Sequence, residues 1–146
     1  MLTDMPDFAA WTFVDGHWRT RRARVWADTL DRSGEIVLTS DGEGGWMLDG
    51  APAPHLDGLI DIDLEASACT NTLPIHRLSF PQGEVVFAAA VYVRALDLSV
   101  TRLEQTYRYL DAGRFDYTSE ADFRAVLEYD ATGLIIDYPG VARRFA

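Results

Sequence analysis

Residues 61–78 hold the densest group of polar side chains in the chain. Asp61 and Asp63 are two residues apart, so on a strand their carboxylates share one face at a separation of roughly 6.5–7 Å. Paired acids at that spacing can bind a cation, or act as general acid and general base. His76 would complete a two-acid, one-histidine metal site if the fold brought it beside them. The structural alternative is that the acids accept hydrogen bonds from Arg77 and nearby backbone.

Two short runs, 59–64 and 73–80, must position these groups. Both alternate polar and apolar residues, and they flank a polar bend, so we expect two strands. On the second strand His76 would share a face with the apolar residues, where a satisfied core histidine is the common case, and Arg77 would point the other way. Pro74 favours extended backbone just before it.

Turn signals recur about every 8–12 residues along the chain, and no long segment has a 3.6-residue period. This pattern predicts an all-β, mainly antiparallel fold with at most one or two short helices. Hairpins are predicted at residues 12–26, 35–48 and 123–139. Residues 84–96 predict one long strand, buried on both faces at its middle or bent by a bulge.

Side-chain alternation and capping signals in the last third of the chain add two expectations. Leu103, Gln105, Tyr107 and Tyr109 alternate with charged residues and threonine, and we expect this set to face inward. A short helix beginning after Ser119 is the alternative to a strand at the start of the last hairpin.

Composition excludes several classes of protein. The net charge is −10, with 23 acidic and 13 basic residues, which argues against nucleic acid as a partner. All the basic residues are arginine, so a lysine Schiff base is excluded. Cys69 is the single cysteine, which excludes an intrachain disulfide and a Cys-rich zinc site, and we expect it to be buried.

Length and hydropathy predict one domain over residues 1–146. No apolar run reaches the roughly 18 residues of a transmembrane segment. The N-terminus lacks the basic start and apolar segment of a secretory signal, so we expect a cytoplasmic protein. The glycine run at 42–45 lacks the spacing of a phosphate loop, and no Gly-x-Ser-x-Gly motif occurs. With no complete catalytic set, we expect no enzymatic activity and no cofactor.

Four strings carry a resemblance that extends from Trp18 to Arg144. They are Asp-Ile-Asp-Leu at 61–64, Thr-Asn-Thr-Leu-Pro-Ile-His-Arg-Leu at 70–78, Gln-Thr-Tyr at 105–107 and Gly-Leu-Ile-Ile-Asp-Tyr-Pro-Gly at 133–140. In this order they resemble the successive motifs of the putative glycolipid-binding family of bacterial proteins. The resemblance implies a strongly curved sheet or half-barrel, similar to periplasmic lipoprotein carriers, with an acyl chain or glycolipid on its concave face.

Two departures from the family pattern have structural consequences. His76 stands where the family pattern leads us to expect a second basic residue, such as arginine. The chain also begins later than family members usually do, so we expect it to be shortened by its initial strands. An edge left unpaired in this way would invite homodimerisation.

Our leading hypothesis is non-catalytic binding of a lipid or glycolipid-like amphiphile. The apolar concavity would take the tail, and polar side chains would hydrogen-bond to the head. The candidate ligand-binding residues are Asp61, Asp63, Asn71, His76, Arg77, Gln105, Tyr107, Asp137 and Tyr138. The alternative is a small metal- or acid/base-dependent enzyme that acts on a sugar or lipid ester through Asp61, Asp63 and His76. A third hypothesis is a structural or oligomerisation module with a filled core.

Overall fold

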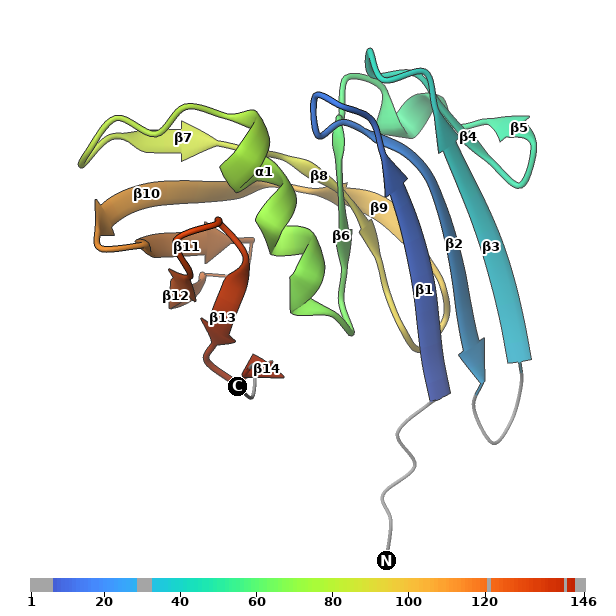
Figure 1. Ribbon diagram of the computed structural model, residues 1–146. Helices are drawn as coiled ribbons and strands as arrows, with labels where there is room; N and C mark the ends of the chain where they lie inside the picture. The colour runs from blue at the N-terminus through green and yellow to red at the C-terminus, as the bar shows by residue number, and fades with distance from the viewer. Residues whose placement is uncertain (1–6, 29–32, 121, 141, 144–146) are drawn as a thin grey trace, which may run out of the picture.

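The computed structural model describes residues 7–28, 33–120, 122–140 and 142–143, and its strands form three sheets (Figure 1). The first sheet is antiparallel and follows chain order: β1 (Asp7–Val14), β2 (Thr20–Asp28), β3 (Ser33–Ser40), β4 (Trp46–Leu48) and β5 (Ala51–Pro52). The second sheet is also antiparallel and has the order β14 (Ala142–Arg143), β13 (Ile135–Tyr138), β12 (Phe123–Tyr129), β11 (Arg114–Ser119), β10 (Gln105–Asp111) and β7 (Val85–Phe87).

The third sheet has three strands and connects the other two: β6 (Asp61–Leu64), β8 (Ala90–Val93) and β9 (Val100–Leu103). Strands β6 and β8 run parallel, and β9 returns antiparallel to β8. Three short helices complete the fold: η1 (Pro54–Leu56), η2 (Ala68–Asn71) and α1 (Thr72–Arg77). Figure 1 shows the first sheet on one side, the six-stranded sheet on the other, and α1 between them.

The expectation of a mainly antiparallel, curved fold built from hairpins is confirmed, although the sheets do not close into a barrel. The hairpins β1–β2, β3–β4 and β12–β13 lie where the turn residues predict them. In the β3–β4 turn, the Asp41 carboxylate accepts hydrogen bonds from the backbone N–H of Glu43 at 2.7 Å and of Gly45 at 3.0 Å. A side chain that satisfies turn donors in this way holds the turn without help from the rest of the fold.

The prediction of a strand at residues 73–80 is wrong, because the segment begins with α1. Pro74 lies in the first turn of the helix, where its missing N–H removes no intrahelical hydrogen bond. Ser67 precedes η2 and accepts a hydrogen bond from the Cys69 backbone N–H at 3.3 Å. The assignment of His76 and Arg77 to opposite faces of a strand therefore fails as well.

Residues 84–96 form two strands in different sheets, not one long strand. Strand β7 pairs with β10, whereas β8 lies between β6 and β9. The chain crosses from one sheet to the other at residues 88–89, so β8 is largely buried while β7 stays mostly exposed. The alternative of a helix after Ser119 is also wrong, since β12 begins at Phe123.

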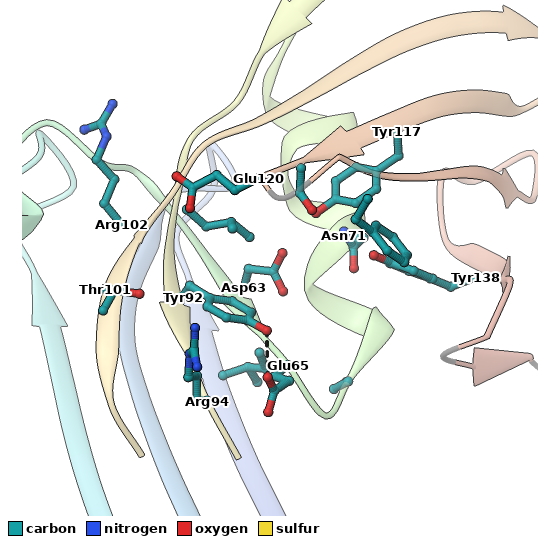
Figure 2. A pocket seen from close by; sticks show the side chains of 15 residues that line it. Asp63, Glu65, Asn71, Tyr92, Arg94, Thr101, Arg102, Tyr117, Glu120 and Tyr138 are labelled. Carbon is teal, nitrogen blue, oxygen red and sulfur yellow. Dashed lines mark hydrogen bonds between the residues drawn. The ribbon is translucent and has the colours of Figure 1, made fainter. Parts of the chain in front are cut away.

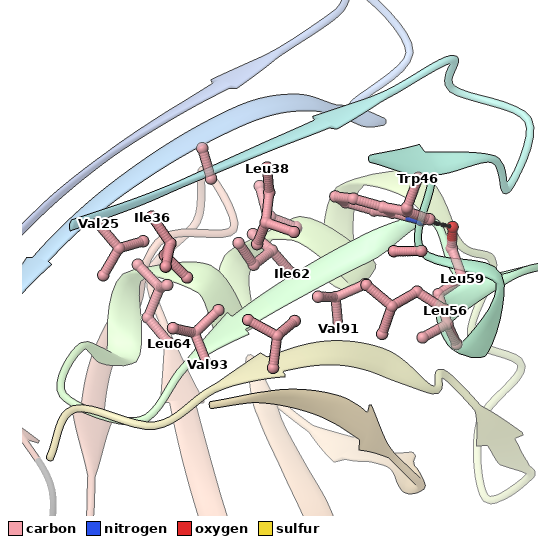
Figure 3. Close-up of a cluster of buried hydrophobic side chains, with 14 residues drawn as sticks. Val25, Ile36, Leu38, Trp46, Leu56, Leu59, Ile62, Leu64, Val91 and Val93 are labelled. Atoms are coloured by element: carbon pink, nitrogen blue, oxygen red, sulfur yellow. Dashed lines mark hydrogen bonds between the residues drawn. The ribbon is translucent and has the colours of Figure 1, made fainter. Parts of the chain in front are cut away.

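Two apolar cores lie on opposite sides of β6. The first, between the five-stranded and three-stranded sheets, includes Ile62, and here Trp46 Nε1 donates to the Leu59 carbonyl at 2.7 Å (Figure 3). The second is rich in tyrosine and contains Tyr107, which is fully buried and faces inward as the alternation predicts. Because side chains alternate along a strand, Asp61 and Asp63 point away from the first core.

Cys69 is exposed, so the expectation that it is buried is wrong. It lies within η2, a single turn that buries Ala68 and Thr70 on either side of it. A helical turn places neighbouring side chains on different faces, and the buried residues next to Cys69 occupy the inner ones.

Candidate functional site

A cavity of about 400 Å³ lies where the three-stranded sheet meets the six-stranded sheet (Figure 2). Strands β6, β8 and β9 supply one side of it, and β11, β12, β13 and the end of η2 supply the other. The lining combines carboxylates, tyrosines, hydroxyls and two arginines. A pocket of this size with a few convergent polar groups is typical of a small-molecule site.

Asp63 is the most unusual group in this cavity. It is 8% exposed, and no described residue hydrogen-bonds to its carboxyl group. Burial raises its pKa to about 7, and the nearby Glu65 carboxylate adds to the rise. At neutral pH the carboxyl group therefore exists in comparable amounts as acid and as carboxylate. Figure 2 shows it between Tyr92 and the Asn71 and Tyr117 side chains.

A buried hydrogen-bond network holds the wall opposite Tyr92. Asn71 Nδ2 donates to the Tyr107 hydroxyl at 2.9 Å, and the Tyr129 hydroxyl donates to the Asn71 carbonyl at 2.8 Å. The Tyr117 hydroxyl donates to Gln105 Oε1 at 2.8 Å. Gln105 and Tyr107 thus lie behind the cavity wall and fix the orientation of the residues that face it.

Aromatic rings form the same wall. The Tyr117 and Tyr138 ring centroids are 5.8 Å apart, and Phe123 lies 6.2 Å from Tyr117 and 6.1 Å from Tyr138. Burial raises the pKa of Tyr138 to about 12, and the neighbouring Asp63 adds to the rise. These phenols stay protonated at neutral pH and offer both ring faces and hydroxyl groups.

Tyr92 and two arginines define the side nearer to solvent. The Tyr92 hydroxyl donates to Glu65 Oε2 at 2.9 Å, and the Ala95 backbone N–H donates to Glu65 Oε1 at 3.1 Å. Arg94 and Arg102 are exposed at the cavity, and Arg102 forms an ion pair with Glu104. The positive charge therefore lies at the rim and the buried negative charge at the floor.

The structure places three of the sequence-predicted site residues, Asp63, Asn71 and Tyr138, in the cavity lining. Asp61 does not line it. Its buried carboxylate accepts from Arg77 Nε at 3.0 Å and from Arg77 Nη2 at 2.7 Å. Burial raises the pKa of Asp61, while the Arg77 guanidinium opposes the rise. The structural alternative predicted for this acid is thus confirmed.

The other predicted residues lie outside the cavity lining. His76 stacks on Trp18 with ring centroids 3.9 Å apart, and its buried Nε2 has no hydrogen-bond partner within the ranges that the structure describes. Gln105 and Tyr107 stand behind the wall, and Asp137 pairs with Glu128 in the β12–β13 register. For these residues, and for Asp61 and Arg77, ligand binding stays a prediction.

The geometry does not support the enzyme alternative. Asp61 pairs with Arg77, Asp63 faces the cavity and His76 stacks on Trp18, so the three proposed groups have separate surroundings. Across the described ranges, no group of three or more histidine, cysteine or acidic residues is arranged to hold a metal ion.

Sequence reasoning missed Tyr92, Tyr117 and Phe123 as cavity residues. Alternation along β11 shows that Tyr117 shares a face with Phe115 and Ser119. The sequence does not show that this face lies against Asp63, because that depends on how the two sheets are arranged. Tyr92 was not predicted as a cavity residue because residues 84–96 predict one continuous strand.

The fold and the cavity define a small, mainly antiparallel β protein with a polar, aromatic pocket between two sheets. A family model described as putative glycolipid-binding matches residues 10–144, and the chain belongs to this family. The crystal structure of a DUF1089 family protein from Pseudomonas aeruginosa is similar, with 35% sequence identity and a TM-score of 0.88. The match covers 94% of this chain and 77% of that one.

Two further comparisons are negative. No curated protein shows significant similarity to the chain. Within the part of the chain that the structure describes, no helix is long and apolar enough to cross a membrane.

Proposed function

We propose that the protein binds the head group of a glycolipid-like amphiphile in the cavity around Asp63, without catalysing a reaction on it. The observation that carries this proposal is a buried carboxyl group, without a hydrogen-bond partner among the described residues, in a cavity of about 400 Å³. An unpaired buried carboxyl group costs stability, and a ligand that hydrogen-bonds to it removes this cost. The family description is consistent with such a ligand.

The aromatic side chains of the cavity wall support the proposal that the head group is a sugar. Tyr117, Phe123 and Tyr138 place ring faces beside the Asp63 carboxyl group, and Ser119 adds a hydroxyl group to the lining. Rings of this kind pack against the apolar faces of a sugar, while carboxylate, amide and hydroxyl groups hydrogen-bond to its edges. Both kinds of group converge on the same space.

A second hollow, of about 660 Å³, offers space for the apolar tail of the amphiphile. It lies between β1 and the η2–α1 segment, and Phe8, Val14 and Leu73 are among its apolar lining residues. It shares Leu64 and Ser67 with the Asp63 cavity, so the two hollows adjoin the same short segment. Each methylene group buried there would contribute about 0.8 kcal/mol.

The test is isothermal titration calorimetry with dodecyl glucoside below its critical micelle concentration. Ser119→Trp fills the cavity with an indole ring, and we expect it to weaken binding by about 10-fold or more, which corresponds to about 1.4 kcal/mol. Thr118→Trp is the matched control, because Thr118 is the neighbour of Ser119 on β11 and points to the other face.

Two results would count against the proposal. The first is that dodecyl glucoside and other alkyl glycosides do not bind to the folded protein. The second is that Ser119→Trp and Thr118→Trp bind with equal affinity to the unaltered protein, which would place the ligand elsewhere.

A further inference from the structure

The polar atoms at the floor of the Asp63 cavity are mostly hydrogen-bond acceptors. Asn71 donates one of its two Nδ2 protons to Tyr107, and its side-chain oxygen adds an acceptor to the cavity lining. The Tyr117 hydroxyl donates to Gln105, so its oxygen acts as an acceptor, and the Ser119 and Tyr138 side chains also interact with it. The Asp63 carboxylate is a third acceptor, without a donor among the described residues.

On the opposite wall, Thr101 and the two rim arginines can donate hydrogen bonds, whereas Tyr92 is an acceptor. Tyr92 donates its hydroxyl proton to Glu65, so its oxygen also remains as an acceptor. A neutral sugar hydroxyl brings one donor and two acceptors, so it can donate to one of these groups and leaves the Asp63 carboxylate without a countercharge. A primary ammonium group brings three donors and no acceptor, which matches the available groups.

Charge favours the same group. The floor carboxylate has no ion-pair partner among the described residues, and Glu65 and Glu120 also line the cavity. Arg94 and Arg102 lie at the rim, where Arg102 is already paired with Glu104. The whole chain has a net charge of −10, which attracts cations at long range.

We infer that the cavity selects head groups that carry a primary ammonium, as an amino sugar does, and that Asp63, Asn71 and Tyr117 bind this group. The inference rests on the proposed function, because it assigns the chemical class of the head group at the same site. The ammonium group would donate to the carboxylate and the amide oxygen, and the ring of Tyr117 would offer a cation–π contact. Tyr138 would serve a neighbouring hydroxyl of the sugar.

Binding of this kind depends on the protonation of Asp63. Glu65 raises the pKa of Asp63, and Asp63 in turn raises the pKa of five tyrosines that surround it. The charged and titratable groups that face Asp63 or line its cavity are Glu65, Tyr92, Arg94, Arg102, Tyr107, Tyr117, Glu120, Tyr129 and Tyr138. The raised pKa values of these tyrosines keep them neutral near pH 7, whereas Asp63, whose pKa is raised to about 7, changes its charge there.

The experiment compares three ligands by calorimetry at pH 7: dodecyl glucoside, its 2-amino-2-deoxy analogue, and the N-acetylated form of that analogue. We expect the amine to bind about 10-fold or more tightly than the other two, since hydrogen bonds to charged groups are the stronger ones. Asp63→Asn should remove this preference, because it removes the negative charge that the ammonium group would meet. Asp28→Asn removes one negative charge from an exposed position and should preserve the preference.

The outcomes separate the two proposals. Equal affinity for all three ligands, with the affinity still lost in the Ser119→Trp variant, would overturn the ammonium inference and leave the proposed function standing. A preference for the amine that persists in Asp63→Asn would also overturn the inference. Failure of all three ligands to bind would reject the proposed function and the inference together.

Discussion

Replacement of Asp63 by asparagine should stabilise the protein at high pH and not at low pH. The carboxyl group is buried, no residue in the described part of the chain donates to it, and burial raises its pKa from 3.8 to about 7. In the unfolded chain the group ionises near its ordinary pKa, whereas in the folded protein it stays protonated until pH 7. Between these values the unfolded state binds fewer protons, so the free energy of unfolding falls as pH rises.

The magnitude follows from the difference between the folded and unfolded pKa values of Asp63. A difference of one in pKa between the two states corresponds to about 1.36 kcal/mol, so the rise to about 7 amounts to roughly 4 kcal/mol at pH 8. Asparagine has nearly the same shape and no charge, so this cost is absent in the variant. Any change in the free energy of unfolding that comes from burying the new amide group does not depend on pH, so it shifts the stability of the variant by the same amount at every pH.

The assay is chemical denaturation of the unaltered protein and of Asp63→Asn at a series of pH values from 4 to 8. We expect the stability difference to grow in favour of Asp63→Asn by about 4 kcal/mol across this range, most steeply between pH 5 and 7. Asp28→Asn, which removes a charge from an exposed position, reports the effect of net charge alone. A difference between Asp63→Asn and the unaltered protein that is flat from pH 4 to 8 would refute the reasoning.

Three further experiments test other features of the fold. Arg77→Met leaves the Asp61 carboxylate buried without its ion-pair partner, and we expect denaturation to show a loss of about 3–5 kcal/mol, against no loss if the pair is dispensable. Gly44→Ala should lower the melting temperature more than Gly50→Ala, because both have positive φ but the new Cβ would meet backbone at 2.8 Å only at Gly44. Equal effects would show that the close approach is relieved cheaply. Cys69 should react with a thiol reagent in the folded protein, and protection until unfolding would contradict its exposure.

The hairpins were predictable because their signals are local. Asp15 and Asp41 accept backbone hydrogen bonds within their own turns, so the sequence around each turn is enough to specify it. Alternation then gives the inward face of β10, where Gln105 and Tyr107 are buried. These features need no knowledge of distant contacts.

Helix α1 was not predictable from its own residues, because distant contacts hold it. Asn71, just before the helix, hydrogen-bonds to Tyr107, and Thr72 Oγ1 accepts from the Ile135 backbone N–H at 3.4 Å. Arg77, the last residue of the helix, forms an ion pair with Asp61. A helix of six residues has too little intrinsic stability to form alone, so tertiary contacts decide its conformation.

The candidate site was predictable only in part for the same reason. The sequence identifies Asp63 as a notable acid and places Asn71 and Tyr138 among the candidates. Tyr92 and Tyr117 come from two different sheets, and the register that brings them to Asp63 is set by β6, β8 and β11 together. Local alternation cannot specify how two sheets meet.

The most direct test of the Asp63 site is a nuclear magnetic resonance titration of its side-chain carboxyl carbon, with and without dodecyl 2-amino-2-deoxyglucoside. In the free protein we expect a midpoint near pH 7, because burial and the nearby Glu65 carboxylate disfavour the charged form. With saturating ligand we expect the midpoint to move clearly below 7, because the bound ammonium group favours the carboxylate. A midpoint near 4 in the free protein, or one near 7 that the saturating ligand leaves unchanged, would contradict the assignment of this cavity as the binding site for the head group.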